Sequence, residues 1–215
     1  MKKLLCLLVL GLMANSATGQ ENLLEGKTLA DFGYFLADNG VQEEVFQLAD
    51  GVLKISGTPM GWLETKKDYK NFTLKAEIRY PEENPNANSG LFLRLVGRGP
   101  AFLPPCVEVQ MKTGNIGDVF GFWGYTVLGD AARAKTKENA IGGKMHTLTK
   151  IRCAQKPGTD AWNQVEITCF EEVVVVRVNG VIVNVAYGVQ NVPGKIAFQS
   201  EGGVVWFRNA VVTEE

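Results

Sequence analysis

The sequence has few of the residue types from which metal and redox sites are usually built. Its 215 residues include one histidine, His146, and four cysteines. A single histidine excludes a zinc site made of several histidines. Three cysteines lie beyond the N-terminal segment, and an odd, sparse set does not predict a disulfide scaffold. We expect these thiols (Cys106, Cys153 and Cys169) to be buried and free, with a Cys153–Cys169 pair as the alternative.

The chain also lacks an excess of positive or negative charge, and it has only one long apolar segment. The formal net charge is −1, so the chain lacks the basic surface with which proteins bind nucleic acids. The one long apolar run, residues 4–13, follows two lysines and precedes small residues at positions 17 and 19. This pattern is typical of a cleavable secretory signal, which we assign to residues 1–19. The run is short for a bilayer span, so we expect a periplasmic or secreted protein without a membrane span.

Residues 20–215 have the length of one domain and the pattern of many short strands. Apolar and polar residues alternate cleanly from Phe72 to Tyr80, as in a half-buried strand. Two hairpins are indicated, one around Asp50-Gly51 and one around Asn179-Gly180, because Asn, Asp and Gly accept positive φ angles. Short strands with frequent turns predict an all-β, antiparallel sandwich of the jelly-roll type. The exception is the segment 129–146, which we expect to be an irregular loop or lid with a short helix near residues 130–137.

Polar side chains interrupt two of the predicted strands. In residues 91–96, the alternation places Arg94 opposite the leucines at positions 91, 93 and 95. In residues 107–110, Glu108 and Gln110 oppose two valines. We therefore expect Arg94, Glu108 and Gln110 to converge on one sheet face that binds something polar. Glu108 is the first candidate for a catalytic carboxylate, with a solvent-facing glutamate on an outer sheet as the equally weighted alternative.

Other candidates surround these strands. Gln199 and Glu201 share a strand face near the end of the chain, although Glu201 could also belong to a plain turn. Glu64 shares a face with Trp62, for which core burial is the commoner fate. Trp123 lies in a Gly-rich aromatic segment that could stack on a sugar. His146 could act as a base near neutral pH, but an exposed loop histidine is the commoner case.

The order of motifs resembles a known family, the 3-keto-disaccharide hydrolase domain family, over about residues 29–212. Its members have a jelly-roll sandwich similar to concanavalin A-like lectins and glucanases. Glu201 stands where many relatives carry histidine. The motifs that carry the resemblance are Gly61–Thr65, Tyr69–Arg79, Asn88–Arg94, Glu108–Gln110, Gly117–Gly121, Lys156–Gly158 with Trp162-Asn163, Val178–Gly180, Phe198–Gly202 and Phe207–Asn209.

The resemblance implies cleavage of glycosides whose sugar is oxidised to a ketone at carbon 3. The ketone acidifies the hydrogen on carbon 2, so a base can remove it, the group on carbon 1 leaves, and water adds afterwards. Such a site needs a base, an acid, and a positive group or metal beside the enolate. The catalytic candidates are Glu108, Glu201 and Arg94, and the substrate-binding candidates are Asn88, Gln110, Trp123, Glu64, Gln199 and His146.

The sequence does not identify a cofactor. A divalent metal held by oxygens of Asn88, Glu108, Gln110 or Glu201 would be calcium or magnesium rather than zinc, because these ions prefer hard oxygen ligands. The expected partner is a carbohydrate. A non-catalytic, lectin-like sandwich is the alternative to an enzyme, and a structural or protein-interaction sandwich is the third class, because one fold serves all three.

Overall fold

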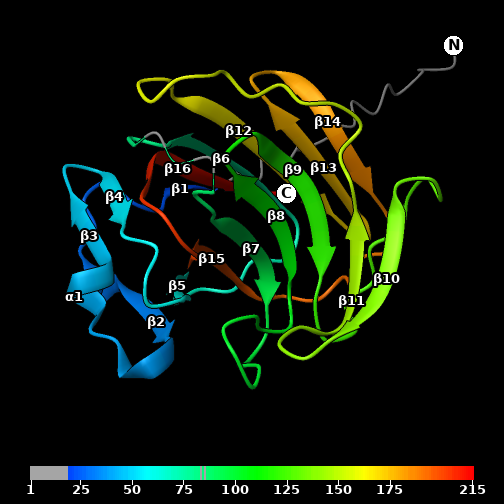
Figure 1. Cartoon of the computed structure of the whole chain (residues 1–215), viewed down its shortest axis with the longest axis horizontal. Helices are drawn as coiled ribbons and strands as arrows, with labels where there is room; N and C mark the ends of the chain where they lie inside the picture. The colour runs from blue at the N-terminus through cyan, green and yellow to red at the C-terminus, as the bar shows by residue number, and fades with distance from the viewer. Residues whose placement is uncertain (1–18, 83, 85) are drawn as a thin grey trace, which may run out of the picture.

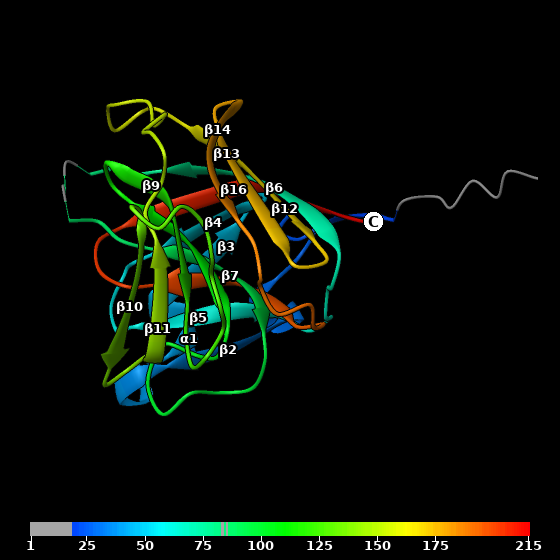
Figure 2. The same ribbon diagram turned by 90° about the vertical axis from the view of Figure 1, so that its right-hand side faces the viewer.

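The computed structural model describes residues 19–82, 84 and 86–215, so nearly all of the predicted signal segment, 1–19, lies outside the described residues. The described chain folds into two eight-stranded antiparallel sheets that pack face to face (Figures 1 and 2). The predicted all-β sandwich is therefore confirmed. No helix in the described part of the chain is long and apolar enough to cross a membrane.

Sheet A contains the strands with the clearest sequence signals. The predicted turns at Asp50-Gly51 and Asn179-Gly180 are present, and all four residues have positive φ angles. In spatial order, sheet A consists of β14 (Val181–Ala186), β13 (Val173–Val178), β12 (Asn163–Phe170), β6 (Phe72–Arg79), β16 (Val205–Glu214), β4 (Val52–Ile55) and β3 (Phe46–Ala49), with β1 (Gln20–Asn22) also paired to β16.

Sheet B carries the predicted polar strands at its centre. Three short helical segments, Leu29–Asp31, Ala37–Asn39 and α1 (Gln42–Val45), lie near its β2 end. In spatial order, sheet B consists of β10 (Ala134–Asn139), β11 (Gly143–Leu148), β9 (Asn115–Gly121), β8 (Val107–Lys112), β7 (Gly90–Leu95), β15 (Lys195–Ser200), β5 (Gly61–Thr65) and β2 (Phe32–Leu36).

The segment 129–146 differs from its prediction. Instead of an irregular lid with a short helix, residues 134–148 form the β10–β11 hairpin, which extends sheet B at its edge (Figure 1). All four residues from Lys135 to Glu138 are exposed. A strand exposed on both faces has no alternation of apolar and polar residues, and charged side chains are typical of a protected sheet edge. The usual signal for a strand is therefore missing from this segment.

The main core lies between the two sheets. Sheet A contributes Leu74 and Ile78 from β6, and sheet B contributes Leu91, Val107 and Val109, all fully buried. A second apolar cluster covers part of the outer face of sheet B. It consists of Trp62, Phe92, Leu95, Leu103, Cys106, Phe122, Met145 and Ala197. Sheet B is thus buried on both sides over much of its area, and all six residues of β7 are buried.

Arg94 does not share the face of Glu108, so this prediction is corrected. Arg94 has a φ of +50°, and the pairing of β7 with β15 shifts by one residue beside it. This bulge breaks the alternation, because the extra residue reverses the direction of the side chains that follow. Arg94 is fully buried and donates hydrogen bonds to the backbone oxygens of Lys70 (2.9 Å), Glu171 (2.7 Å) and Gln190 (2.7 Å).

These bonds predict a structural role for Arg94. Replacing it by methionine should lower the free energy of unfolding by about 2–4 kcal/mol, because buried carbonyl groups would lose a charged donor. Denaturant unfolding measures this loss, and Arg152→Met, at an exposed arginine, is the matched control. Equal stability of the Arg94 and Arg152 variants would contradict the structural assignment.

Candidate active site

Two predicted residues, Glu108 and Gln110, project from the outer face of sheet B. Their cross-strand partners in β7 are Phe92 and Gly90, respectively. Phe92 belongs to the outer apolar cluster, whereas the neighbours of Glu108 in β8, Val107 and Val109, belong to the core between the sheets. The valines therefore hold β8 in the sandwich while Glu108 and Gln110 point the other way, as predicted for this strand.

Gly90 shapes the floor of this site because it has no side chain. A Cβ atom at Gly90 would lie 2.5 Å from Oε1 of Glu108 and 2.7 Å from Oε1 of Gln199. Glu108 and Gln199 belong to β8 and β15, the two strands that flank β7. Both side chains therefore reach across the space that a larger residue would fill, and the missing Cβ lets them approach one another over the middle strand.

Asn88 and Glu201 meet where β7 begins and β15 ends. The Nδ2 atom of Asn88 donates a hydrogen bond of 2.7 Å to Oε2 of Glu201, and its backbone N–H donates to the Gly202 oxygen at 2.7 Å. The Ser89 hydroxyl donates a hydrogen bond, also of 2.7 Å, to the backbone oxygen of Gln199. These bonds hold the entry to β7 against the exit from β15, so Glu201 has a fixed place beside the Glu108 strand.

Several buried polar atoms of this cluster have no partner. Among the described residues, the set comprises Oδ1 of Asn88, Oε1 of Glu108, Oε1 of Gln110 and both amide atoms of Gln199. Buried polar groups in proteins are nearly always hydrogen-bonded. Several unpartnered polar atoms in one place therefore indicate a site where a ligand binds. Four of these five atoms are oxygens, which would accept hydrogen bonds from hydroxyl groups or coordinate a hard cation.

The two carboxyl groups are electrostatically linked. Glu108 is 3% exposed, and burial followed by the charge of Glu201 raises its pKa well above the usual value. Burial raises the pKa of Glu201 to about 7, although the neighbouring Gln199 amide and the Lys112 ammonium oppose this shift. Two carboxyl groups in such a setting release their protons in separate steps. The pair therefore holds a proton near neutral pH and can both donate and accept one.

His146 does not join this cluster. It was predicted in a loop, but it lies in β11, where the pleat decides its direction. Thr147 pairs with Phe120, which in turn pairs with Glu108, so Thr147 points to the site face and His146 to the opposite one. Its nearest polar contact is Thr136, 3.1 Å from Nδ1. The prediction that His146 contacts substrate at this site is therefore corrected.

Glu64 and Trp123 lie on the site face but apart from the carboxyl pair. Glu64 accepts a 2.7 Å hydrogen bond from the indole of Trp62, which is fully buried. Three strand spacings, about 14 Å, separate Glu64 from Glu108 along the row of paired residues. Trp123 packs against the outer apolar cluster and donates to the Leu103 oxygen at 2.7 Å. Their contact with a sugar stays a prediction.

Two residues beside the carboxyl pair, Lys112 and Gly90, were not predicted from the sequence as members of the site. Lys112 follows Glu108 and Gln110 at the same spacing, so continuing the alternation by two residues would have found it. Gly90 lies within the Asn88–Arg94 motif, but its importance depends on the side chains of the two flanking strands. Only the strand order brings those side chains together, and strand order is not visible in a local pattern.

The donor set fits a hard divalent cation better than a transition metal. In the described part of the chain, no three His, Cys, Asp or Glu side chains come together as a metal-binding group. The two carboxyl groups and the unpartnered amide oxygens are nevertheless the ligand types of calcium and magnesium. Such an ion would rest on Glu108 and Glu201, with amide oxygens of Asn88, Gln110 and Gln199 completing its coordination.

Comparisons with known proteins agree with the predicted family and fold. Residues 19–213 match the family model of the 3-keto-alpha-glucoside-1,2-lyase-like domain. No curated protein matches the chain significantly in sequence.

Three solved structures illustrate the fold. A Parabacteroides distasonis protein with the provisional name glycosyl hydrolase is 20% identical, and the match covers 92% of this chain and 100% of that one with a TM-score of 0.62. A carbohydrate-binding module from Bacillus subtilis is 10% identical (86% and 96% covered, TM-score 0.59). A Bacillus licheniformis β-glucanase is 13% identical (92% and 97% covered, TM-score 0.55). These likenesses establish a concanavalin A-like sandwich and, at such identities, nothing finer.

The carboxyl pair predicts an unusual dependence of stability on pH in metal-free buffer. Because the folded protein holds the Glu201 proton up to about pH 7 and an unfolded chain releases it near the ordinary carboxyl value, stability falls as pH rises through this window. Glu108→Gln removes a carboxyl group that burial and the charge of Glu201 keep from ionising, and it should raise the free energy of unfolding at pH 8 by about 1–3 kcal/mol.

Denaturant unfolding between pH 5 and pH 8, with chelator present, checks this prediction. Glu138→Gln, at an exposed glutamate of β10, is the control and should leave the pH dependence unchanged. A Glu108→Gln protein that is less stable than wild type at pH 8 would rule out the proposed repulsion.

Proposed function

Because the chain belongs to the family of 3-keto-alpha-glucoside-1,2-lyase-like domains, which act on carbohydrates, we propose that it is an exported enzyme that cleaves 3-keto-glycosides. The observation that carries the proposal is the pair of desolvated carboxyl groups, Glu108 and Glu201, among unpartnered polar atoms on the outer face of sheet B. This pair can supply the two proton transfers that an elimination needs.

Glu201 is the proposed base. It is partly exposed, accepts a hydrogen bond from Asn88, and has the Lys112 ammonium nearby, all of which favour its ionised form. Asn88 also fixes the direction of the carboxylate, so Asn88 acts as a positioning residue. In the proposed reaction, Glu201 removes the proton from carbon 2, whose acidity comes from the neighbouring ketone.

Glu108 is the proposed acid. Its Oε1 atom receives no hydrogen bond, and burial disfavours its charge, so Glu108 retains a proton that it can donate. As the bond between carbon 1 and the leaving oxygen breaks, Glu108 protonates that oxygen, and a double bond forms between carbons 1 and 2. Water then adds across this bond and yields the free 3-keto sugar. Gln110 and Gln199 offer buried amides to the sugar hydroxyls.

We extend the proposal to a calcium or magnesium ion on the oxygen cluster. When bound, such an ion supplies positive charge beside the developing enolate, which Arg94 cannot do from its position in the sandwich. The positive charge would also favour the ionised form of Glu201, whose hydrogen bond from Asn88 keeps it directed. Glu108 would contribute an oxygen of its protonated carboxyl group, Oε1, and keep the proton that it donates.

A non-catalytic, lectin-like domain is the alternative. The comparison with a carbohydrate-binding module shows that the same sandwich also serves binding proteins. Release of the leaving group distinguishes the two functions, because a binding module would retain the 3-keto-glycoside unchanged.

Variants of the carboxyl pair test the reaction. Glu201→Gln and Glu108→Gln should each lower kcat about 10²–10⁴-fold, the usual contribution of a general base or acid. The measurement is release of a chromophoric alcohol from a 3-keto-glucoside, and wild-type kcat/KM should rise through an apparent pKa near 7. Glu138→Gln is the control that should keep full activity. If both site variants also keep it, these residues do not perform the reaction.

Metal binding has its own test. Calcium or magnesium at about a hundred times its Kd should stabilise the wild-type protein by about 2.7 kcal/mol, since it binds the folded state alone. The measurement is the unfolding temperature with added ion and with chelator. Glu201→Gln should lose most of this response, because it removes the charged oxygen ligand. The extension to a metal fails if the two conditions give the same unfolding temperature and the same rate of leaving-group release.

A further inference from the structure

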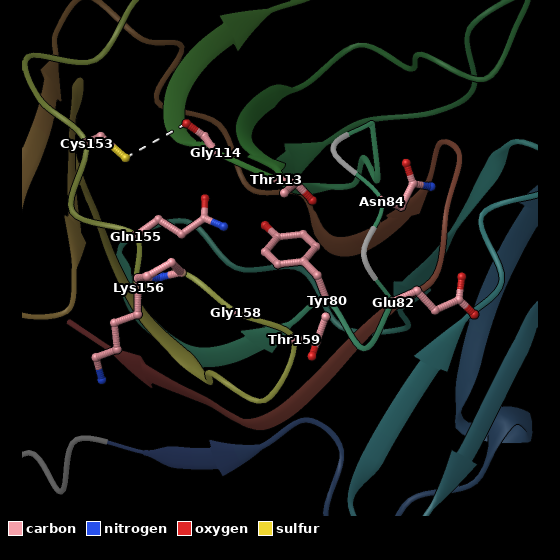
Figure 3. A pocket seen from close by; sticks show the side chains of 11 residues that line it. Tyr80, Glu82, Asn84, Thr113, Gly114, Cys153, Gln155, Lys156, Gly158 and Thr159 are labelled. Atoms are coloured by element: carbon pink, nitrogen blue, oxygen red, sulfur yellow. Dashed lines mark hydrogen bonds between the residues drawn. The ribbon is translucent and has the colours of Figure 1, made fainter.

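A cavity of about 550 Å³ opens at one end of the sandwich, and neither Glu108 nor Glu201 lines it. Its walls are the turn between β8 and β9, the segment 153–159, and the chain that follows β6 (Figure 3). Ligand pockets for small molecules have volumes of this order. The residues around the cavity are Tyr80, Glu82, Asn84, Thr113, Gly114, Cys153, Gln155, Lys156, Pro157, Gly158 and Thr159.

The aromatic wall of the cavity is fixed. Tyr80 is 4% exposed, and its hydroxyl donates a 2.7 Å hydrogen bond to the Met111 oxygen. Because burial raises its pKa far above the ordinary value, this hydroxyl keeps its proton at any physiological pH. The ring therefore stays in place between the sheets at the inner wall of the cavity, whose surface is mainly apolar.

Two polar atoms of the cavity lack partners. Oγ1 of Thr113 and Oε1 of Gln155 are buried, and neither makes a hydrogen bond within the described protein. Figure 3 shows the Gln155 amide turned toward the Tyr80 hydroxyl, whereas the Lys156 ammonium points away from the cavity. Buried oxygens of this kind are satisfied by hydroxyl donors. Glu82 and Lys156 are both exposed, and the Glu82 carboxylate also points away from Tyr80 (Figure 3). The inner wall thus offers apolar surface and hydrogen-bonding oxygens, and the charged groups are directed away from it.

We propose that this cavity is a second carbohydrate site, which binds a neutral pyranose unit. A pyranose presents a face of C–H groups, which suits the mainly apolar surface of the cavity, and a rim of hydroxyls, which suits Thr113 and Gln155. The absence of charge from the inner wall favours a neutral sugar over an acidic one. The inference stands on the cavity alone and does not require the reaction proposed for Glu108 and Glu201.

The cavity lies next to the carboxyl pair, Glu108 and Glu201. The backbone N–H of Thr113 donates a 2.9 Å hydrogen bond to the oxygen of Ala87, the residue before Asn88. The turn after β8, which forms a wall of the cavity, is therefore bonded to the strand entry that carries Asn88, the residue that directs Glu201. A saccharide that occupies the cavity would lie close to the site of cleavage without contacting the carboxyl groups.

Cys153 provides a reporter of occupancy. All three described cysteines are free, as predicted, and Cys106 and Cys169 are buried. Cys153 is exposed, so the prediction that it is buried was wrong. Its Sγ atom lies 3.8 Å from the Gly114 oxygen, on the cavity wall (Figure 3). A sugar in the cavity should shield this thiol from alkylation. The experiment measures the rate at which N-ethylmaleimide modifies Cys153, resolved from the other cysteines by peptide mass spectrometry.

The probe is methyl α-D-glucopyranoside, which has no ketone and is not cleaved by the proposed reaction. At about ten times its Kd, it should slow alkylation of wild-type Cys153 about tenfold, because only the unoccupied fraction reacts. Gln155→Leu should weaken the sugar affinity about tenfold by removing a buried acceptor. Thr113→Val gives the same test should the Gln155 variant fail to fold, as judged by circular dichroism.

Two further measurements distinguish sugar binding in the cavity from the reaction proposed for Glu108 and Glu201. Glu108→Gln should keep full protection of Cys153, and Gln155→Leu should keep the release of leaving group from a 3-keto-glucoside. The proposal is overturned if saturating sugar leaves wild-type alkylation unchanged, if both cavity variants remain fully protected, or if Glu108→Gln loses protection. The last result would mean that the sugar binds at the carboxyl pair rather than in the cavity.

Discussion

The desolvation of Glu108 is the constraint on which the rest of the site depends. Its carboxyl group is buried on the outer face of sheet B, close enough to Glu201 for the charge of Glu201 to raise the pKa of Glu108 further. Such a placement is unfavourable by itself, since a buried carboxylate needs a partner. It persists because β8 is anchored from the other side, where Val107 and Val109 belong to the core between the sheets. Gly90 then leaves the space into which Glu108 and Gln199 reach.

Burial of sheet B on both faces explains why its outer surface is divided. Toward one side the outer apolar cluster, with Trp62, Phe92 and Phe122, covers the strands. Toward the other, Glu108, Gln110 and Gln199 leave polar atoms without partners. A sugar has both apolar C–H surface and hydroxyls, so it matches a sheet face on which apolar and polar side chains lie next to one another. The division follows from two strands: Cys106 and Ala197 belong to the apolar cluster, whereas Glu108 of β8 and Gln199 of β15, two residues further on, are polar.

Local patterns predicted much of the fold, and tertiary context decided the rest. The alternation in β6 and the Asn179-Gly180 turn are local signals, and both were confirmed. The β10–β11 hairpin was missed because an exposed edge strand carries no apolar period. Arg94 was misplaced because a bulge shifts the direction of side chains by one residue, and a regular alternation contains no sign of it. The neighbourhood of Glu108, Gln199 and Gly90 depends on strand order, which only the whole fold determines.

The arrangement of the carboxyl pair favours chemistry over simple binding. A lectin that recognises a neutral sugar can do so with amides and hydroxyls, whose burial is less unfavourable than that of two repelling carboxyl groups. Here Asn88, Gln110 and Gln199 already supply amides, so Glu108 and Glu201 would weaken a binding protein without improving recognition. Perturbed carboxyl groups are expected where protons must move, because a base and an acid need pKa values near the working pH. The stability lost by burying Glu108 and Glu201 therefore supports the proposal that these two groups transfer protons in a reaction.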